Sequence, residues 1–185
     1  MEKKPKRIRF SLRTLLILTV VAGAAIGVYV SRAESQKRVS QWLRTEHGRR
    51  LHIYYNFQHG RGKSIPAGAE TVKPSVPELL VDMLGIDYFA TITALDCEGV
   101  DDLEKISELR GLEILAVATP SPCDLSRLSN LKNLRSLILH MPTNDLSPLY
   151  CLASLKDLHL KEGEFSEAEL SRLKSEMPEI TVWVR

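Results

Sequence analysis

The chain contains little of what catalysis, phosphate binding or metal binding requires. Only three of its 185 residues are cysteines, and no two of them form a C-x-x-C pair, which argues against a structural zinc site. The phosphate-binding patterns G-x-x-x-x-G-K-[ST] and G-x-G-x-x-G are absent, and so are the hydrolase motifs G-x-S-x-G and H-E-x-x-H. We therefore expect no enzyme activity, no bound metal and no cofactor.

Three cysteines are also too few, and odd in number, for a disulfide framework. Cys97 falls at an inward position of an expected strand, where a thiol behaves as a small buried apolar group. Cys123 and Cys151 could pair if the domain lies outside the cytoplasm, because cytosolic thiols are kept reduced. The sequence leaves that pairing open.

Charge is strongly segregated along the chain, although the formal net charge is only +2. Residues 1–13 and 32–63 carry excess positive charge, whereas residues 64–185 carry excess negative charge. A nucleic-acid-binding domain needs basic side chains to neutralise phosphates, so the acidic C-terminal part predicts no nucleic-acid binding. The basic segments flank an apolar run, where anionic lipid headgroups are the simpler partner.

That apolar run predicts a transmembrane helix over residues 14–30, which contain no charged side chain. Counted from Phe10 to Val30, and interrupted only by Arg13, the run rises roughly 31 Å as a helix, enough to cross the hydrocarbon core. The positive-inside rule places residues 1–13, a basic leader, in the cytoplasm. The chain is then a single-pass signal anchor whose C-terminal domain is extracytoplasmic.

Two further interpretations concern the same segment. The small-x-small sequence from Ser31 to Ala33 is also compatible with cleavage of residues 1–33 as a signal peptide. Gly23 and Gly27 form a G-x-x-x-G pattern, which lets two membrane helices approach closely and predicts a homodimer.

Residues 31–49 predict a juxtamembrane stalk helix, and residues 50–89 predict an N-terminal cap. The cap is expected to contain a strand near residues 51–57 and a helix that begins at Pro77 and ends before Gly85. We expect this strand and helix to cover the open end of the domain that follows, because a terminal repeat otherwise exposes its core.

The most informative pattern occupies residues 90–185, where an L-x-x-L-x-L phrase recurs with first positions 92, 112, 134, 155 and 177. Such a period is the signature of a repeat solenoid, with one short strand in each repeat. Asp102, Asp124 and Asp145 follow successive strands and are expected to cap the next turn. Ser166 and Glu169 form a capping box that begins a C-terminal helix cap.

The segment from Asp145 to Leu149, D-L-S-P-L, matches a characteristic phrase of bacterial leucine-rich repeats. The repeats of residues 90–185 resemble that family, with 20–22-residue repeats of the internalin type, and the segment Arg9–Leu16 resembles the leader of membrane-anchored bacterial members. The resemblance implies an α/β fold: a short leucine-rich-repeat solenoid with an N-terminal strand and helix cap, preceded by one transmembrane helix. It also implies protein recognition on the concave face rather than catalysis.

Alternate residues of each strand point to that concave face. The predicted protein-binding residues are Ser136, Ile138, His140, Asp157, His159, Lys161 and Trp183. Nothing in these residue types identifies the partner protein. The alternative hypothesis is a structural envelope protein that acts by self-association, through Gly23 and Gly27 or through the edge of the solenoid.

Overall fold

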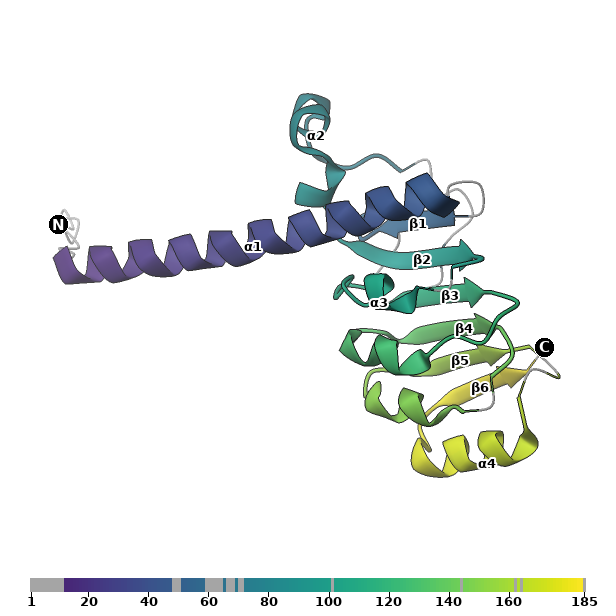
Figure 1. Ribbon diagram of the computed structural model, residues 1–185. Helices are drawn as coiled ribbons and strands as arrows, with labels where there is room; N and C mark the ends of the chain where they lie inside the picture. Colours follow the sequence, from purple (N-terminus) through teal and green to yellow (C-terminus); the bar gives the residue numbers. More distant parts are fainter. Residues whose placement is uncertain are drawn as a thin grey trace, which may run out of the picture.

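The chain folds as a mixed α/β protein with one six-stranded sheet and one long N-terminal helix (Figure 1). The computed structural model describes residues 12–47, 51–58, 65, 69, 72–100, 102–143, 145–161, 163 and 165–184. The predicted basic leader therefore lies outside the described residues, except for Leu12 and Arg13.

The strands lie in the sheet in the order in which they occur in the chain. They are β1 (Leu51–Tyr55), β2 (Ile92–Glu98), β3 (Ile114–Ala118), β4 (Ser136–His140), β5 (Asp157–Leu160) and β6 (Thr181–Val184). β1 is antiparallel to β2, and every later strand is parallel to the one before it.

The inward positions of the parallel strands form a continuous row. Leu95, Leu115, Leu137 and Leu158 pair with one another in register, and each is at most 1% exposed. Because these leucines repeat at nearly constant spacing, each new strand buries its apolar side against the previous one.

The last strand departs from the predicted spacing. The phrase that begins at residue 177 predicts Val182 opposite Leu160, which holds the same place in the preceding phrase. Val182 instead pairs with Leu158, so the predicted register of β6 is wrong by two residues. The connection between β5 and β6 contains a longer helix than the earlier connections, so β6 begins two residues later in the chain than predicted. A shift of two residues preserves the alternation of a strand, so Trp183 stays on the face where it was predicted.

Short helices connect the parallel strands and lie on one side of the sheet (Figure 1). They are α3 (Leu103–Ile106), η3 (Leu125–Asn130), η4 (Ser147–Cys151) and α4 (Glu167–Glu176). The side chain of Asp124 accepts from the Ser126 amide at 3.0 Å, and that of Asp145 accepts from the Ser147 amide at 2.9 Å. These hydrogen bonds from the two serines, hydroxyl and amide, lower the pKa of both carboxyl groups.

The capping box that begins α4 is only half formed. The Ser166 hydroxyl accepts from the Glu169 amide at 3.2 Å, as the sequence predicts. The Glu169 carboxylate instead accepts from the Leu146 amide at 3.4 Å, so it ties α4 to the preceding connection. Leu173 of α4 is fully buried and closes the C-terminal end of the core.

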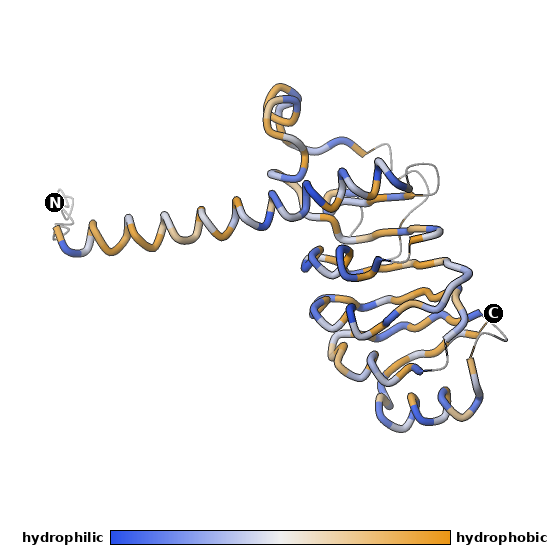
Figure 2. The backbone as a smooth tube through the Cα atoms, viewed as in Figure 1, coloured by the Kyte–Doolittle hydropathy of each residue, from blue (hydrophilic) through white to orange (hydrophobic). Residues whose placement is uncertain are grey.

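The N-terminal helix α1 (Leu12–His47) is continuous and has two halves with different surroundings. Every described residue from Leu12 to Tyr29 is exposed, and Figure 2 shows this free half to be largely hydrophobic. By length and composition, α1 is the one helix among the described residues that could cross a membrane, and a signal sequence has the same character.

The second half of α1 packs against the first strands of the sheet (Figure 1). Ala33, Val39 and Leu43 are at most 5% exposed, and Leu43 joins the same apolar core as the repeat leucines. The segment predicted as a stalk is therefore part of the folded domain, and it covers the open end of the core.

The helix predicted to cover that end lies elsewhere. α2 (Glu78–Leu84) has no buried residue, so the prediction that it covers the core is wrong. The 36-residue α1 provides the longer apolar stripe, and it covers the open end of the core instead of α2. A short helix, η2 (Ile86–Tyr88), follows α2 and packs on α1.

Candidate functional site

The outward-pointing side chains of all six strands form one continuous surface, which we call the outer sheet face. One row across the strands consists of His52, Asp96, Ala116, Ile138, His159 and Trp183. The neighbouring row consists of Tyr54, Ala94, Ile114, Ser136, Asp157 and Thr181. Residues directly opposite each other in paired strands share a face, so these rows are fixed by the register.

Aromatic rings stand at both ends of this face. His52 and Tyr54 of β1 stack with ring centroids 6.4 Å apart, and His159 and Trp183 stack with centroids 6.0 Å apart. Trp183 is 48% exposed, so much of its ring surface is accessible. Aromatic side chains of this kind contribute strongly to protein interfaces because they bury large areas with few rotatable bonds.

The centre of the face is small and apolar. Ala116 and Ile138 occupy the middle of one row and are partly exposed, whereas Ala94 in the other row is fully buried. Exposed charged residues, Asp96 and Glu98, lie toward the β1 end of the face. An apolar centre with a polar rim is the composition expected of a protein-binding patch.

The structure brings most of the predicted site residues together. Ile138, His159 and Trp183 are neighbours in one row, and Ser136 and Asp157 are paired in the next. His140 ends β4 opposite Ala118, and Lys161 follows the end of β5, so these two lie at the strand-end margin of the face; both are exposed.

Sequence reasoning missed the contribution of β1 to this face. His52 and Tyr54 join it only because β1 pairs antiparallel with β2. The segment L-H-I-Y-Y does alternate, with His52 exposed and Tyr55 buried, so the period-two pattern was a usable signal. Nothing local, however, indicated which strand β1 would pair with.

The histidines and the aspartate of the face are spread over neighbouring strands in the part of the chain that the structure describes. Asp157 and His159 lie in different rows of β5, and His140 lies at the strand-end margin. No group of three or more His, Cys, Asp or Glu side chains among the described residues could hold a metal ion. No disulfide joins Cys97, Cys123 and Cys151 in the structure. Burial raises the pKa of the Cys97 thiol to about 12, with a smaller contribution from Asp96, so it is a poor nucleophile.

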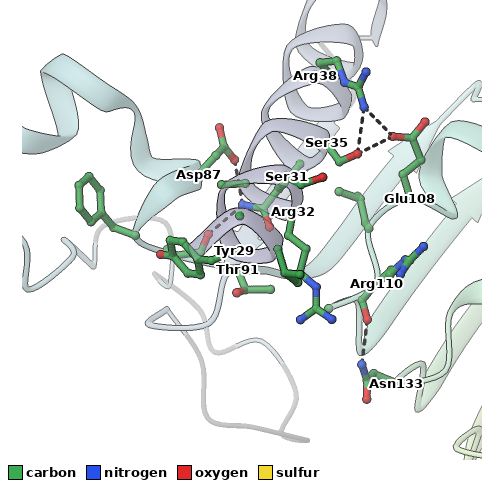
Figure 3. A pocket seen from close by; sticks show the side chains of 18 residues that line it. Tyr29, Ser31, Arg32, Ser35, Arg38, Asp87, Thr91, Glu108, Arg110 and Asn133 are labelled. Carbon is green, nitrogen blue, oxygen red and sulfur yellow. Dashed lines mark hydrogen bonds and ion pairs between the residues drawn. The ribbon is translucent and has the colours of Figure 1, made fainter. Parts of the chain in front are cut away.

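A second surface feature lies where α1 meets the repeats. A cavity of about 970 Å³ opens between the middle of α1 and the loop before β3 (Figure 3). Arg32 and Arg38 of α1 and Arg110 of that loop line it, together with Asp87 and Glu108. Glu108 accepts a hydrogen bond from Ser35 at 3.1 Å and pairs with Arg38 at 3.7 Å, so the pocket wall links helix to loop.

Polar contacts next to this cavity hold α1 against the sheet. Gln36 donates to the Ala90 carbonyl at 2.8 Å and accepts from the Ile92 amide at 2.9 Å. Asp87 accepts from Gln36, Ser40 and Tyr55 at 3.0, 3.2 and 3.4 Å. Burial, with the nearby Asp87 charge, raises the pKa of Tyr55 to about 12. These contacts fix the angle at which α1 leaves the domain.

No family model matches this chain, and no curated protein matches it. Among solved structures, the crystal structure of an internalin C2 from Listeria monocytogenes is similar to it, with 27% sequence identity and a TM-score of 0.37. The match covers 45% of this chain and 37% of the internalin chain.

Proposed function

We propose that this chain is a membrane-anchored leucine-rich-repeat solenoid that presents its outer sheet face to a protein partner outside the cytoplasm. Its role is binding rather than catalysis. The observation that carries this proposal is the outer sheet face itself, which runs across all six strands with an apolar centre and stacked aromatic rings at both ends.

The membrane part of the proposal is supported by the free half of α1. Leu16, Ile17 and Leu18 are each more than 60% exposed, so packing against the domain does not account for the apolar character of this half. Lipid provides the apolar surroundings that such a surface needs. The basic leader supports a cytoplasmic N-terminus, and hence an extracytoplasmic domain.

A pair of substitutions on the outer sheet face tests the binding role. Trp183→Ala removes the exposed ring that stacks on His159, and Ile138→Arg puts a charge in the apolar centre. Each is expected to weaken capture of the partner by the full-length protein from crosslinked envelopes at least tenfold, because aromatic anchors at interfaces contribute roughly 2 kcal/mol or more.

Asn130→Arg is the matched control, because Asn130 is exposed on η3, away from the outer sheet face. It adds the same charge as Ile138→Arg and is expected to leave capture unchanged. Circular dichroism of each variant reports whether the fold is intact. Equal capture by the wild type, Trp183→Ala and Ile138→Arg proteins would contradict the proposed site.

Self-association through α1 is the second candidate function. It is favoured by the G-x-x-x-G pattern of Gly23 and Gly27, which both lie on the exposed half of α1. If two copies pack there, Gly23→Leu is expected to abolish crosslinked dimers in membranes, because the larger side chain prevents close approach. A protein that remains monomeric with either residue at position 23 would contradict self-association through α1.

A further inference from the structure

The short helix α2 carries an apolar stripe that the rest of the described chain leaves uncovered. Leu79 and Met83 are 70% and 71% exposed, and Leu80 and Leu84 are 39% and 45% exposed. These four residues occupy neighbouring positions on the helix surface, because side chains four apart lie one above the other. The patch faces away from the core, which α1 already covers, so its apolar character needs another explanation.

The position of α2 along α1 suggests what covers it. The Lys37 ammonium lies 3.5 Å from the Leu84 carbonyl, and the Tyr29 hydroxyl donates to the Tyr88 carbonyl. The end of α2 and the residues after it therefore lie beside the stretch of α1 from Tyr29 to Lys37. The apolar run ends at Val30, and the seven residues from there to Lys37 rise about 10 Å, so this stretch of α1 crosses a headgroup layer of roughly 5–8 Å and ends just beyond it.

The direction of α2 fits the same location. In Figure 1, α2 is seen close to end-on whereas α1 runs across the picture, so α2 lies across the direction of α1. A helix perpendicular to a membrane span lies parallel to the membrane surface. This is the orientation of interfacial amphipathic helices, which bury one apolar side among the outer parts of the acyl chains.

The charge around the neighbouring cavity is complementary to anionic lipids. Arg32 and Arg110 are exposed at its rim, in addition to Arg38, which pairs with Glu108. The parallel strands point away from the free half of α1 (Figure 1), so the loops that precede them face the same side as that half. The cavity lining carries Arg32, Arg38 and Arg110 against Asp87 and Glu108, a small positive excess, although residues 64–185 as a whole are acidic.

From these observations we propose that α2 lies in the headgroup layer of the membrane that α1 crosses, with its apolar stripe toward the acyl chains and with Arg32 and Arg110 at the lipid phosphates. This inference rests on the proposed membrane anchoring. The two contacts, α1 through the membrane and α2 on its surface, hold the repeat domain in one orientation. The outer sheet face then stands upright at the side of the domain, available to partners that approach along the membrane.

Site-specific fluorescence quenching in vesicles tests the contact. The full-length chain carries Cys123→Ser and Cys151→Ser, and Cys97 is retained because it is fully buried. One new cysteine is labelled with a polarity-sensitive fluorophore. The vesicles contain phosphatidylcholine and phosphatidylglycerol, with a fraction of the lipid carrying a nitroxide quencher high on its acyl chain.

Three labelled positions separate the two proposals. Leu18→Cys, in the middle of the free half of α1, reports membrane insertion. Met83→Cys reports the apolar stripe, and Asp82→Cys is its matched control on the same helix, also exposed but at a polar position outside the stripe. The expected result is strong quenching at positions 18 and 83 and much weaker quenching at position 82.

The other outcomes separate failure of the membrane anchor from failure of the α2 contact. Quenching at position 18 with equal, weak signals at 82 and 83 leaves the anchor standing and removes α2 from the membrane surface. Absence of quenching at all three positions overturns the anchor, and the surface contact with it. Self-quenching between labels at position 83 on two copies, without lipid quenching, assigns the stripe to a dimer and overturns the membrane contact.

Discussion

Leu43 offers the most direct test of the packing between α1 and the repeats. Its side chain is fully buried at the end of the core, with Val39 on the same helix and Tyr55 and Ile92 of the first two strands in the same apolar cluster. Leu43→Ala removes three carbons from a site where strands and helix both limit relaxation. Buried Leu→Ala substitutions cost about 2–5 kcal/mol, since transfer free energy is lost and a cavity remains.

The assay is thermal unfolding of the full-length protein in lipid nanodiscs, followed by circular dichroism. For a domain of this size, 1 kcal/mol corresponds to about 2–4 °C, so the melting temperature is expected to fall by about 4–20 °C. Leu18→Ala is the matched control, with the same chemical change in the same helix at a residue that is 61% exposed. It is expected to alter stability by less than about 0.5 kcal/mol.

Equal melting temperatures for the two variants would contradict the packing of Leu43 in the core. They would mean that the second half of α1 contributes no more to the core than the first, and that something else covers the first strands. A large effect of Leu43→Ala alone establishes the second half as the N-terminal cap. The distinction matters because a packed helix fixes the orientation of the domain, whereas a loose stalk does not.

Three further predictions concern polar groups near the core. Gln36→Ala leaves the buried Ile92 amide without its acceptor, and urea denaturation is expected to show a loss of about 1–3 kcal/mol; an unchanged unfolding midpoint contradicts this role of Gln36. The raised pKa of Tyr55, about 12 against 10 when unfolded, favours the neutral phenol, so stability present below pH 10 is lost as the pH rises toward 12. Tyr55→Phe is expected to flatten this part of the pH profile; an unchanged slope contradicts the assignment. In native protein, iodoacetamide is expected to modify the exposed Cys151 and spare the buried Cys97, whose pKa is about 12; mass spectrometry after digestion distinguishes the two.

The local patterns of the repeats were predictable because each depends on a few neighbouring residues. The inward leucines specify strands that cannot bury their apolar side alone, and the aspartates at 102, 124 and 145 cap the next turn through bonds spanning two or three residues. The alternation within each strand likewise assigned Ile138, His159 and Trp183 to one face. Parallel pairing at constant spacing places Ile138 and His159 in one row, whereas Trp183 joins that row because β6 is displaced by two residues from the expected register.

The register of the last strand and the composition of the site required the tertiary structure. β6 is displaced by two residues because α4 lengthens the connection from β5. The L-x-x-L-x-L phrase alone does not indicate the length of that connection. His52 and Tyr54 enter the site through antiparallel pairing between segments about forty residues apart. The cavity at Arg32 and Arg110 likewise joins segments that share no local signal.

The inward leucines, the capped turns between strands and an apolar N-terminal segment long enough to cross a membrane all follow from local sequence. Which apolar helix closes the core follows from tertiary packing. α1 and α2 both carry apolar stripes, and the local pattern does not show which of the two covers the core. That depends on the total area that each helix can bury against β1 and β2. The longer α1 buries Val39 and Leu43 there, and the apolar side of α2 is left facing outward.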